Sequence, residues 1–238
     1  MGNTGSNTQS HNKKDEYKGG MRNGKRHGFG TYKTVSGYTY EGNWLNDQPH
    51  GQGCEQWSNG NSFMGSFIDG QATGSGIYTW SNGDRYTGQF LTGKREGEGQ
   101  MVYTDGTTYK GGFLNNLYHG QGTLTRPSGW TYNGEWVAGH KHGKGFCLDD
   151  NGTEFQAHWV DDYMKGYGEM KTEKGDTYKG EFSGDMYHGQ GIYESHEGPE
   201  AYRYEGQWFN GRYHGQGILV RANGDRLEGQ WAMGALVN

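Results

Sequence analysis

The sequence is poor in hydrophobic residues, which make up only 30% of its 238 positions, and it contains no run of 18 apolar residues. The first shortage argues against a conventional layered core, and the second predicts that no helix crosses a membrane. The N-terminal segment has neither the apolar core of a signal peptide nor the Arg-rich pattern of a transit peptide. We therefore expect a protein of the cytoplasm or nucleus.

Clustered basic charge is also missing. Lysine and arginine occur singly or in pairs, and the formal net charge is −5. Nucleic acid phosphates require a clustered basic surface, so we expect no nucleic acid partner. A chain this low in hydrophobic residues would be disordered if it also lacked aromatics, but this one has 18 Tyr, 9 Phe and 8 Trp. The chain is therefore expected to fold.

Glycine is in excess, at 47 residues, and most of these glycines recur with a 23-residue period. Nine full repeats begin at residues 17, 40, 63, 86, 109, 132, 155, 178 and 204, and a truncated tenth begins at 227. Residues 1–16 precede the array as a tail that we expect to be disordered. The eighth repeat has three extra residues after Gly198, which should lie in a turn. A sequence motif that recurs at a fixed spacing indicates a structural repeat rather than a catalytic site.

Each repeat is expected to form one β-hairpin. Its first, third and fifth positions read aromatic, glycine, aromatic, and this alternation places all three on one face of a strand. A second strand should follow at about positions 12 to 18. Between repeats lie dipeptides that supply the positive φ angles of tight turns. They are Asn59-Gly60, Asn82-Gly83, Asp105-Gly106, Asn151-Gly152 and Asn223-Gly224.

The glycines are expected to make room for the aromatic rings. If position 5 lies opposite position 12 and position 3 opposite position 14, both second-strand glycines share a face with the rings. Glycine normally weakens a strand, but a ring that covers bare backbone restores the lost contacts. The fifth position would then form an aromatic face, made of Trp44, Phe67, Phe90, Phe113, Trp136, Trp159, Phe182, Trp208 and Trp231.

Two stretches, YEGNWLNDQPHGQG from Tyr40 and YEGQWFNGRYHGQG from Tyr204, resemble the MORN repeat, the membrane occupation and recognition nexus motif. The resemblance covers residues 17–238. It implies an all-β fold, an elongated, twisted, single antiparallel sheet of stacked β-hairpins with open ends. It also implies a non-catalytic module that binds protein partners or membranes. The departures are local: Met21 replaces an aromatic, Ala157 a glycine, and Thr73, Glu96 and Lys165 a histidine.

Metal binding and catalysis are not expected. Six repeats carry a histidine at position 11, namely His27, His50, His119, His142, His188 and His214. Neighbouring hairpins should separate these side chains by about 9 to 10 Å, whereas two ligands of one zinc ion both lie about 2 Å from it. Cys54 and Cys147 stand four repeats apart and should be free thiols. No Ser/His/Asp set occurs apart from the repeated positions, so we expect no enzyme activity. No helix-forming segment follows the Gly-x-Gly pairs, so we expect no phosphate-binding loop and no cofactor.

Positions 9 and 10 are interpreted as the hairpin tip, where a protein interface would place exposed aromatics and a lipid site would place lysine and arginine. Early tips are basic, at Lys25-Arg26 and Lys94-Arg95. The later tips should form an apolar ridge that binds a protein partner. Its residues are Leu117, Tyr118, Tyr163, Met164, Met186, Tyr187 and Tyr213. The alternative is that these tips fold back and cover the edge of the sheet.

The leading functional hypothesis is a structural scaffold for protein partners, as in the MORN proteins of cytoskeletal and ciliary assemblies. A competing hypothesis is a membrane tether that binds acidic phospholipid, helped by an N-myristoylation pattern at Gly2. A third is a regulatory subunit of a separate enzyme. The tenth repeat is expected to consist of one uncovered strand, which predicts a homodimer through the C-terminal repeats or pairing with a partner strand.

Overall fold

The computed structural model describes residues 14–196 and 198–237. The chain divides into two compact units, Met1–Lys94 and Arg95–Asn238. The expected disordered tail falls on residues 1–16, of which 1–13 lie outside the described residues, and the first strand begins at Glu16.

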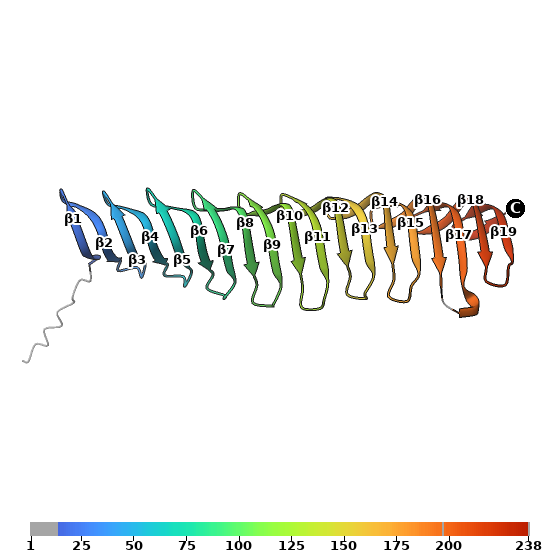
Figure 1. The fold of residues 1–238 in the computed structure, drawn as a ribbon, viewed down its shortest axis with the longest axis horizontal. Helices are drawn as coiled ribbons and strands as arrows, with labels where there is room; N and C mark the ends of the chain where they lie inside the picture. The colour runs from blue at the N-terminus through green and yellow to red at the C-terminus, as the bar shows by residue number, and fades with distance from the viewer. Residues whose placement is uncertain (1–13, 197, 238) are drawn as a thin grey trace, which may run out of the picture. The chain divides into compact units, whose positions relative to one another are not determined.

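The first unit is built from antiparallel strands that pair in chain order (Figure 1). The strands are β1 (Glu16–Arg22), β2 (Lys25–Lys33), β3 (Thr39–Leu45), β4 (Gln48–Gln56), β5 (Ser62–Ile68), β6 (Gln71–Thr79) and β7 (Arg85–Leu91). Each of the first three repeats supplies two of them and β7 is the first strand of the fourth, so the expected β-hairpin is confirmed for these three repeats.

The second unit continues the same pattern, and its strands also pair in chain order. They are β8 (Lys94–Val102), β9 (Thr108–Leu114), β10 (Leu117–Thr125), β11 (Thr131–Val137), β12 (His140–Leu148), β13 (Glu154–Val160), β14 (Tyr163–Lys171), β15 (Thr177–Ser183), β16 (Met186–Ser195), β17 (Tyr202–Phe209), β18 (Arg212–Arg221), β19 (Arg226–Ala232) and β20 (Ala235–Val237). A short 3-10 helix, η1 (Gly198–Glu200), lies between β16 and β17. The all-β fold of antiparallel hairpins is confirmed.

The tenth repeat contains a second strand that the sequence analysis missed. Strand β20 pairs with β19 over three residue pairs, from Gln230↔Val237 to Ala232↔Ala235. The three residues of β20 are exposed. Pairing of this end with a second copy of the chain stays a prediction.

The tips of the hairpins lie at positions 7 and 8, so the prediction of a tip at positions 9 and 10 is wrong. Both tip residues have positive φ angles, which is the signature of a two-residue type I′ turn. The tips are Asn23-Gly24, Asn46-Asp47, Asp69-Gly70, Thr92-Gly93, Asn115-Asn116, Ala138-Gly139, Asp161-Asp162, Gly184-Asp185, Asn210-Gly211 and Met233-Gly234. Glycine, asparagine and aspartate predominate here because they tolerate this backbone best.

The turns between repeats use a different geometry. In the second repeat the backbone amide of Trp57 donates to the carbonyl of Asn61, and that of Gly60 donates to the carbonyl of Trp57, both at 2.9 Å. Only the glycine at position 21 has a positive φ, +89° at Gly60. The loop therefore combines a turn with a single left-handed residue, a common three-residue hairpin connection.

The register within a hairpin confirms one expected pair and corrects the other. Gly42 lies opposite Gly53, as predicted for positions 3 and 14, but Trp44 lies opposite Pro49 rather than opposite Gly51. A two-residue tip pairs position 5 with position 10, so a bulge near position 12 must absorb two extra residues. Gly51 sits in this bulge with φ +74° and pairs with Phe67 of the next repeat.

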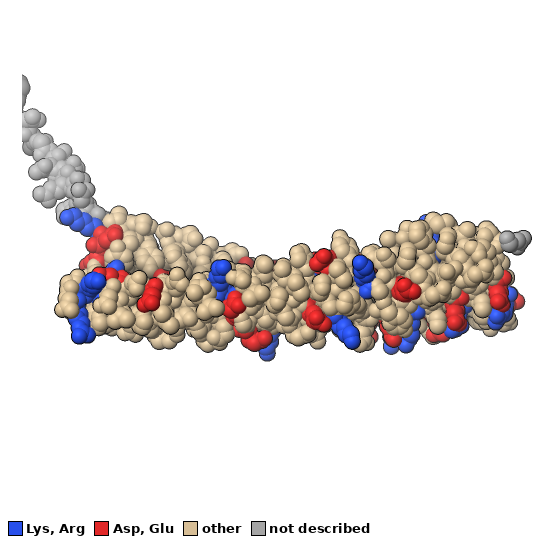
Figure 2. Space-filling model, turned by 90° about the horizontal axis from the view of Figure 1, so that it is seen from above, with Lys and Arg blue, Asp and Glu red and all other residues tan. Residues whose placement is uncertain are grey.

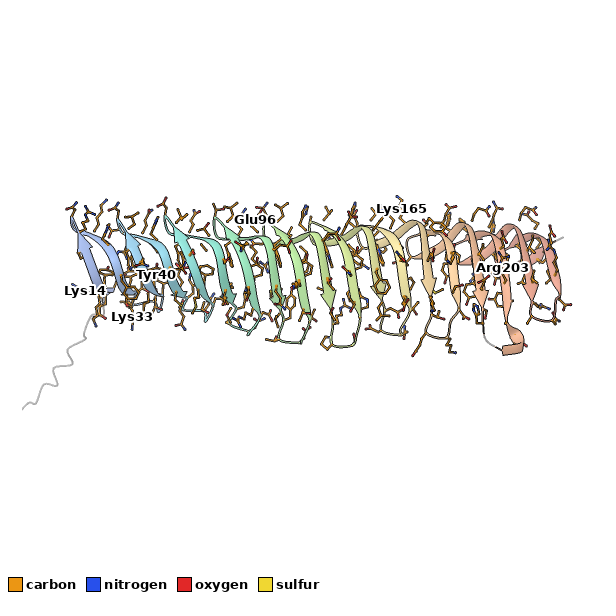
Figure 3. All side chains as sticks on the ribbon, in the orientation of Figure 1. Lys14, Lys33, Tyr40, Glu96, Lys165 and Arg203 are labelled. Carbon is orange, nitrogen blue, oxygen red and sulfur yellow. The ribbon has the colours of Figure 1, made fainter. Side chains whose placement is uncertain are left out.

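In each unit the core is a layer of rings over glycine backbone on one face of the sheet, here called the ring face. Tyr40 at position 1 is completely buried, and its hydroxyl donates to the carbonyl of Asn43 at 2.8 Å. A Cβ on Gly42 would lie only 2.7 Å from that hydroxyl oxygen. Figure 3 labels this tyrosine among the side chains of the first unit. The expected role of glycine at positions 3 and 14 is therefore confirmed, whereas the glycine at position 12 serves the bulge.

Candidate interaction surfaces

The nine rings predicted as the aromatic face are core residues. Each of Trp44, Phe67, Phe90, Phe113, Trp136, Trp159, Phe182, Trp208 and Trp231 is at most 6% exposed. The tryptophan indoles also bond across repeats: Trp136 Nε1 donates to the carbonyl of Gly122 at 3.0 Å, and Trp208 Nε1 to that of Gly191 at 3.1 Å. These rings hold neighbouring hairpins together and offer a partner little surface.

The seven residues predicted as one ridge lie on two opposite faces, because positions 9 and 10 are successive strand residues. The four at position 10 lie on the ring face. Three are tyrosines that stack on buried position-1 tyrosines: Tyr118 on Tyr109 at 3.6 Å between centroids, Tyr187 on Tyr178 at 3.8 Å, and Tyr213 on Tyr204 at 3.8 Å. The fourth, Met164, is buried opposite Trp159. The three at position 9, Leu117, Tyr163 and Met186, are exposed on the other face.

Cations at position 10 also cover the core. The guanidinium carbon of Arg26 lies 4.0 Å from the centroid of the Trp44 ring, and Lys141 Nζ lies 3.7 Å from that of Trp159. Burial lowers the pKa of Lys141. Both charges are thus engaged in cation–π contacts. Arg26, one of the basic residues expected to meet lipid headgroups, points at the ring face. The proposed lipidation site, Gly2, lies outside the described residues.

The ring face of the eighth and ninth repeats forms a groove of about 370 Å³, here called the tyrosine groove. It is lined by Tyr187, Tyr193, Tyr202, Trp208, Gly211, Arg212, Tyr213 and Gly234. Burial raises the pKa of Tyr187 to about 12, so this phenol stays neutral at physiological pH. The three-residue insertion of the eighth repeat lies directly before Tyr202. The groove thus adjoins the one place where the 23-residue period is broken.

The opposite face carries a row of exposed apolar side chains near the tips of the second unit, here called the tip ridge. It consists of Leu114, Leu117, Val137, Tyr163, Met186 and Phe209, which are between 41% and 59% exposed. Leu114 and Leu117 are paired across one hairpin. Leu114, Val137 and Phe209 occupy position 6, which the sequence analysis overlooked. The signal was available, because position 6 is also apolar at Leu45, Ile68, Leu91 and Val160.

The histidines of position 11 share the face of the tip ridge. His188 and His214 flank Phe209, with centroid distances of 5.4 and 5.5 Å. Glu96 and Lys165, which replace this histidine, lie near the tips of their hairpins (Figure 3). Among residues 14–196 and 198–237, no three His, Cys, Asp or Glu side chains lie close enough to hold a metal ion. The thiols of Cys54 and Cys147, both in that part of the chain, are free.

Charges on the drawn face are scattered, with lysine and arginine interspersed among aspartate and glutamate (Figure 2). Within the described ranges, no helix is long and apolar enough to cross a membrane. Charges of opposite sign therefore alternate on the drawn face, and no patch of one sign covers it.

Glu55 gives the first unit a pH dependence. Its carboxylate accepts a hydrogen bond from the Tyr38 hydroxyl at 2.7 Å, but burial dominates and raises the pKa of Glu55. The folded state then binds the proton more tightly than the unfolded state, so stability falls as pH rises from the ordinary glutamate range through the raised pKa. We expect Glu55→Gln to raise the urea midpoint at pH 7 and to have no such effect at pH 3. Glu41→Gln, at an exposed carboxylate of β3, is the control for loss of charge; an equal gain there would contradict the burial argument.

Three known structures resemble this chain, each at 12% sequence identity or less. The TCP10 domain of CPAP from Danio rerio, solved with a peptide of STIL, is 12% identical with a TM-score of 0.45, covering 91% of this chain and 100% of that chain. The same domain in a second structure is 9% identical with a TM-score of 0.41, covering 85% and 89%. A streptogramin B lyase is 9% identical with a TM-score of 0.17, covering 92% and 88%. No curated protein matches.

The family model described as the MORN repeat matches nearly every residue of the nine full repeats. The matched segments are residues 17–37, 40–62, 63–85, 86–108, 109–131, 132–154, 155–177, 178–198 and 204–226. They coincide with the hairpins, their type I′ tips and the rings packed over glycine. The chain belongs to the MORN-repeat family.

Proposed function

We propose that this protein is a non-catalytic scaffold that binds a protein partner through the tip ridge. The observation that carries the proposal is the row of six large apolar side chains exposed on neighbouring hairpins of the second unit. Contiguous exposed apolar surface marks interaction sites on soluble proteins, and aromatic residues and methionine are enriched in protein interfaces. Tyr163 and Met186 supply these two types within the ridge.

The ridge is separable from the core. Its side chains point away from the ring face, so the stacked rings and their cross-repeat hydrogen bonds do not depend on them. Substituting exposed side chains of this kind usually changes the free energy of unfolding by no more than about 0.5 kcal/mol. A binding defect in ridge variants would therefore report on contact with a partner and not on unfolding.

The test is the triple variant Leu117→Ser, Tyr163→Ser and Met186→Ser, used as bait in native lysate beside the wild type. We expect the proteins captured by the wild type to be lost and the thermal melting curve to stay unchanged. Met64→Ser, at a methionine that is 59% exposed in the first unit, is the matched control and should capture the same proteins as the wild type. Equal capture by the triple variant would refute the ridge as the interface.

We further propose a cytoskeletal or ciliary location, on the basis of the resemblance to MORN proteins of such assemblies. The support is family membership, and the exposed ridge supplies a surface by which the chain would join an assembly. After detergent extraction of cells, the wild type should stay in the cytoskeletal pellet and the ridge triple variant should move to the supernatant. Release of both proteins by detergent would instead favour the membrane tether.

A further inference from the structure

We propose that β1 pairs antiparallel with β1 of a second copy of this chain, so that the sheets of two first units join edge to edge. One side of β1 pairs with β2, and no other described strand pairs with it (Figure 1). An unpaired strand edge is a template for another strand. This interface is distinct from the pairing predicted at β20, and the inference goes beyond the tip ridge and does not depend on it.

The ring face is incomplete at the edge formed by β1. Met21 is 58% exposed, whereas the nine rings at the same position of the other repeats are at most 6% exposed. Tyr17 is partly exposed, although the position-1 tyrosines of the later repeats are completely buried. Natural sheets often protect an open edge with a proline or an inward-pointing charge. On its ring face β1 presents Tyr17, Gly19 and Met21 instead, so an added strand would cover apolar surface.

The sequence of β1 is complementary to itself when two copies pair about Gly19. Glu16 then lies opposite Arg22 of the second copy, and Tyr17 lies opposite Met21. Two-fold symmetry makes each of these pairs occur twice. The charged pairs share the face opposite the rings and the apolar pairs share the ring face, because side chains alternate along a strand. Opposite charges and sulfur–aromatic contacts both stabilise pairs of this kind.

The same register keeps glycine opposite glycine, as at the other junctions between repeats of this unit. Those junctions contain the pairs Gly30↔Gly42, Gly53↔Gly65 and Gly76↔Gly88. In β1 the Tyr17 hydroxyl donates to the carbonyl of Gly20 at 2.8 Å, and a Cβ on Gly19 would lie 2.6 Å from that hydroxyl oxygen. The ring therefore packs over Gly19, and a second glycine opposite it leaves both rings undisturbed.

Arg22 also needs a negative charge on its free side. Within its own hairpin it lies opposite Lys25, and both side chains are exposed. Like charges directly opposite each other destabilise a sheet. Glu16 of the second copy would offset this repulsion, while its carboxylate keeps the contact with Lys18 Nζ at 2.8 Å that it makes within its own strand.

Other antiparallel registers bring like charges together. A slide of two residues in one direction places Lys18 opposite Lys18 of the second copy. The same slide in the other direction places Lys18 opposite Arg22 at two sites. A slide of one residue sets the ring face of one copy beside the opposite face of the other. The charges of β1 thus specify the register centred on Gly19.

Sedimentation equilibrium of the full chain tests the charged pairs. We expect the wild type to self-associate at about 100 µM and to dissociate on dilution, because one pair of strands buries less surface than a permanent interface. Arg22→Glu and Glu16→Arg should each weaken association at least about tenfold, because each creates two like-charge pairs. The double variant with both changes exchanges the charges and should associate as the wild type does.

A mixture of the two single variants gives the sharpest comparison. Neither should associate alone as the wild type does, but an equimolar mixture should, because opposite charges then meet at both ends of the interface. Arg85→Glu, at an exposed arginine of β7 in the same unit, is the matched control and should behave as the wild type. Association through β20 would be common to all these proteins. A monomeric wild type, a single variant that associates as strongly as the wild type, or a mixture no stronger than its components would each overturn the proposal.

Discussion

Replacing Gly134 with alanine should lower the free energy of unfolding by about 3 kcal/mol or more, because the site has no room for a methyl group. A Cβ there would lie 2.6 Å from the Cα of Gly145 and 2.7 Å from the hydroxyl oxygen of Tyr132. The first contact is with backbone, which cannot move away without opening the sheet. The second contact would displace the completely buried ring of Tyr132 from the glycine backbone on which it packs.

The seventh repeat shows the effect of a Cβ at this position on the burial of the ring. It carries Ala157 at the same position, and its position-1 ring, Phe155, is only half-buried, whereas Tyr132 and Tyr178 in the neighbouring repeats are completely buried. Ala157→Gly is therefore the matched control, with the reverse change at the equivalent site. It should alter stability by no more than about 1 kcal/mol, the usual cost of glycine in a strand. Urea denaturation of the two variants tests the argument, which fails if Gly134→Ala is as mild as Ala157→Gly.

The period of the array and the packing of rings over glycine could be predicted because both depend on which residue types recur at fixed positions. The alternation of aromatic, glycine and aromatic residues is typical of a β-strand with one packed face. Glycine is required between the rings because a Cβ on Gly42 would collide with Tyr40. The tip was misplaced for a local reason. Asn210-Gly211 and Asp69-Gly70 are two-residue hairpin signals at positions 7 and 8, but the sequence analysis placed the tip at positions 9 and 10 instead.

The site could be predicted only in part, because positions 9 and 10 were placed together in a tip, whereas they are successive strand residues that point to opposite faces. With the tip at positions 7 and 8, Tyr163 and Met164 point to opposite faces, and one is 59% exposed while the other is 5% exposed. The bulge compounded the error, since counting back from Gly168 without it would not place Met164 opposite Trp159. The bulge requires a positive φ angle, which glycine permits but does not require. The glycine at position 12 was therefore not enough to predict the bulge.

The second large effect is expected from the triple variant Tyr118→Ser, Tyr187→Ser and Tyr213→Ser, which should be markedly less stable than the wild type. Each ring lies nearly parallel to a buried tyrosine, at 14° to 16°, and shields it from water. Removing a half-buried aromatic of this kind should cost about 2 kcal/mol at each site. Tyr187 and Tyr213 both contact Trp208, so their two effects should not simply add.

The informative comparison is with the ridge triple variant Leu117→Ser, Tyr163→Ser and Met186→Ser, which alters the preceding position in neighbouring hairpins. Chemical denaturation should show a large drop in midpoint for the position-10 variant and almost none for the position-9 variant, although both exchange three large side chains for serine. The contrast follows from strand alternation alone: position 10 faces the rings, and position 9 faces solvent. Equal midpoints for the two variants would mean that the stacked tyrosines do not cover the core, and the assignment of the two faces would then be wrong.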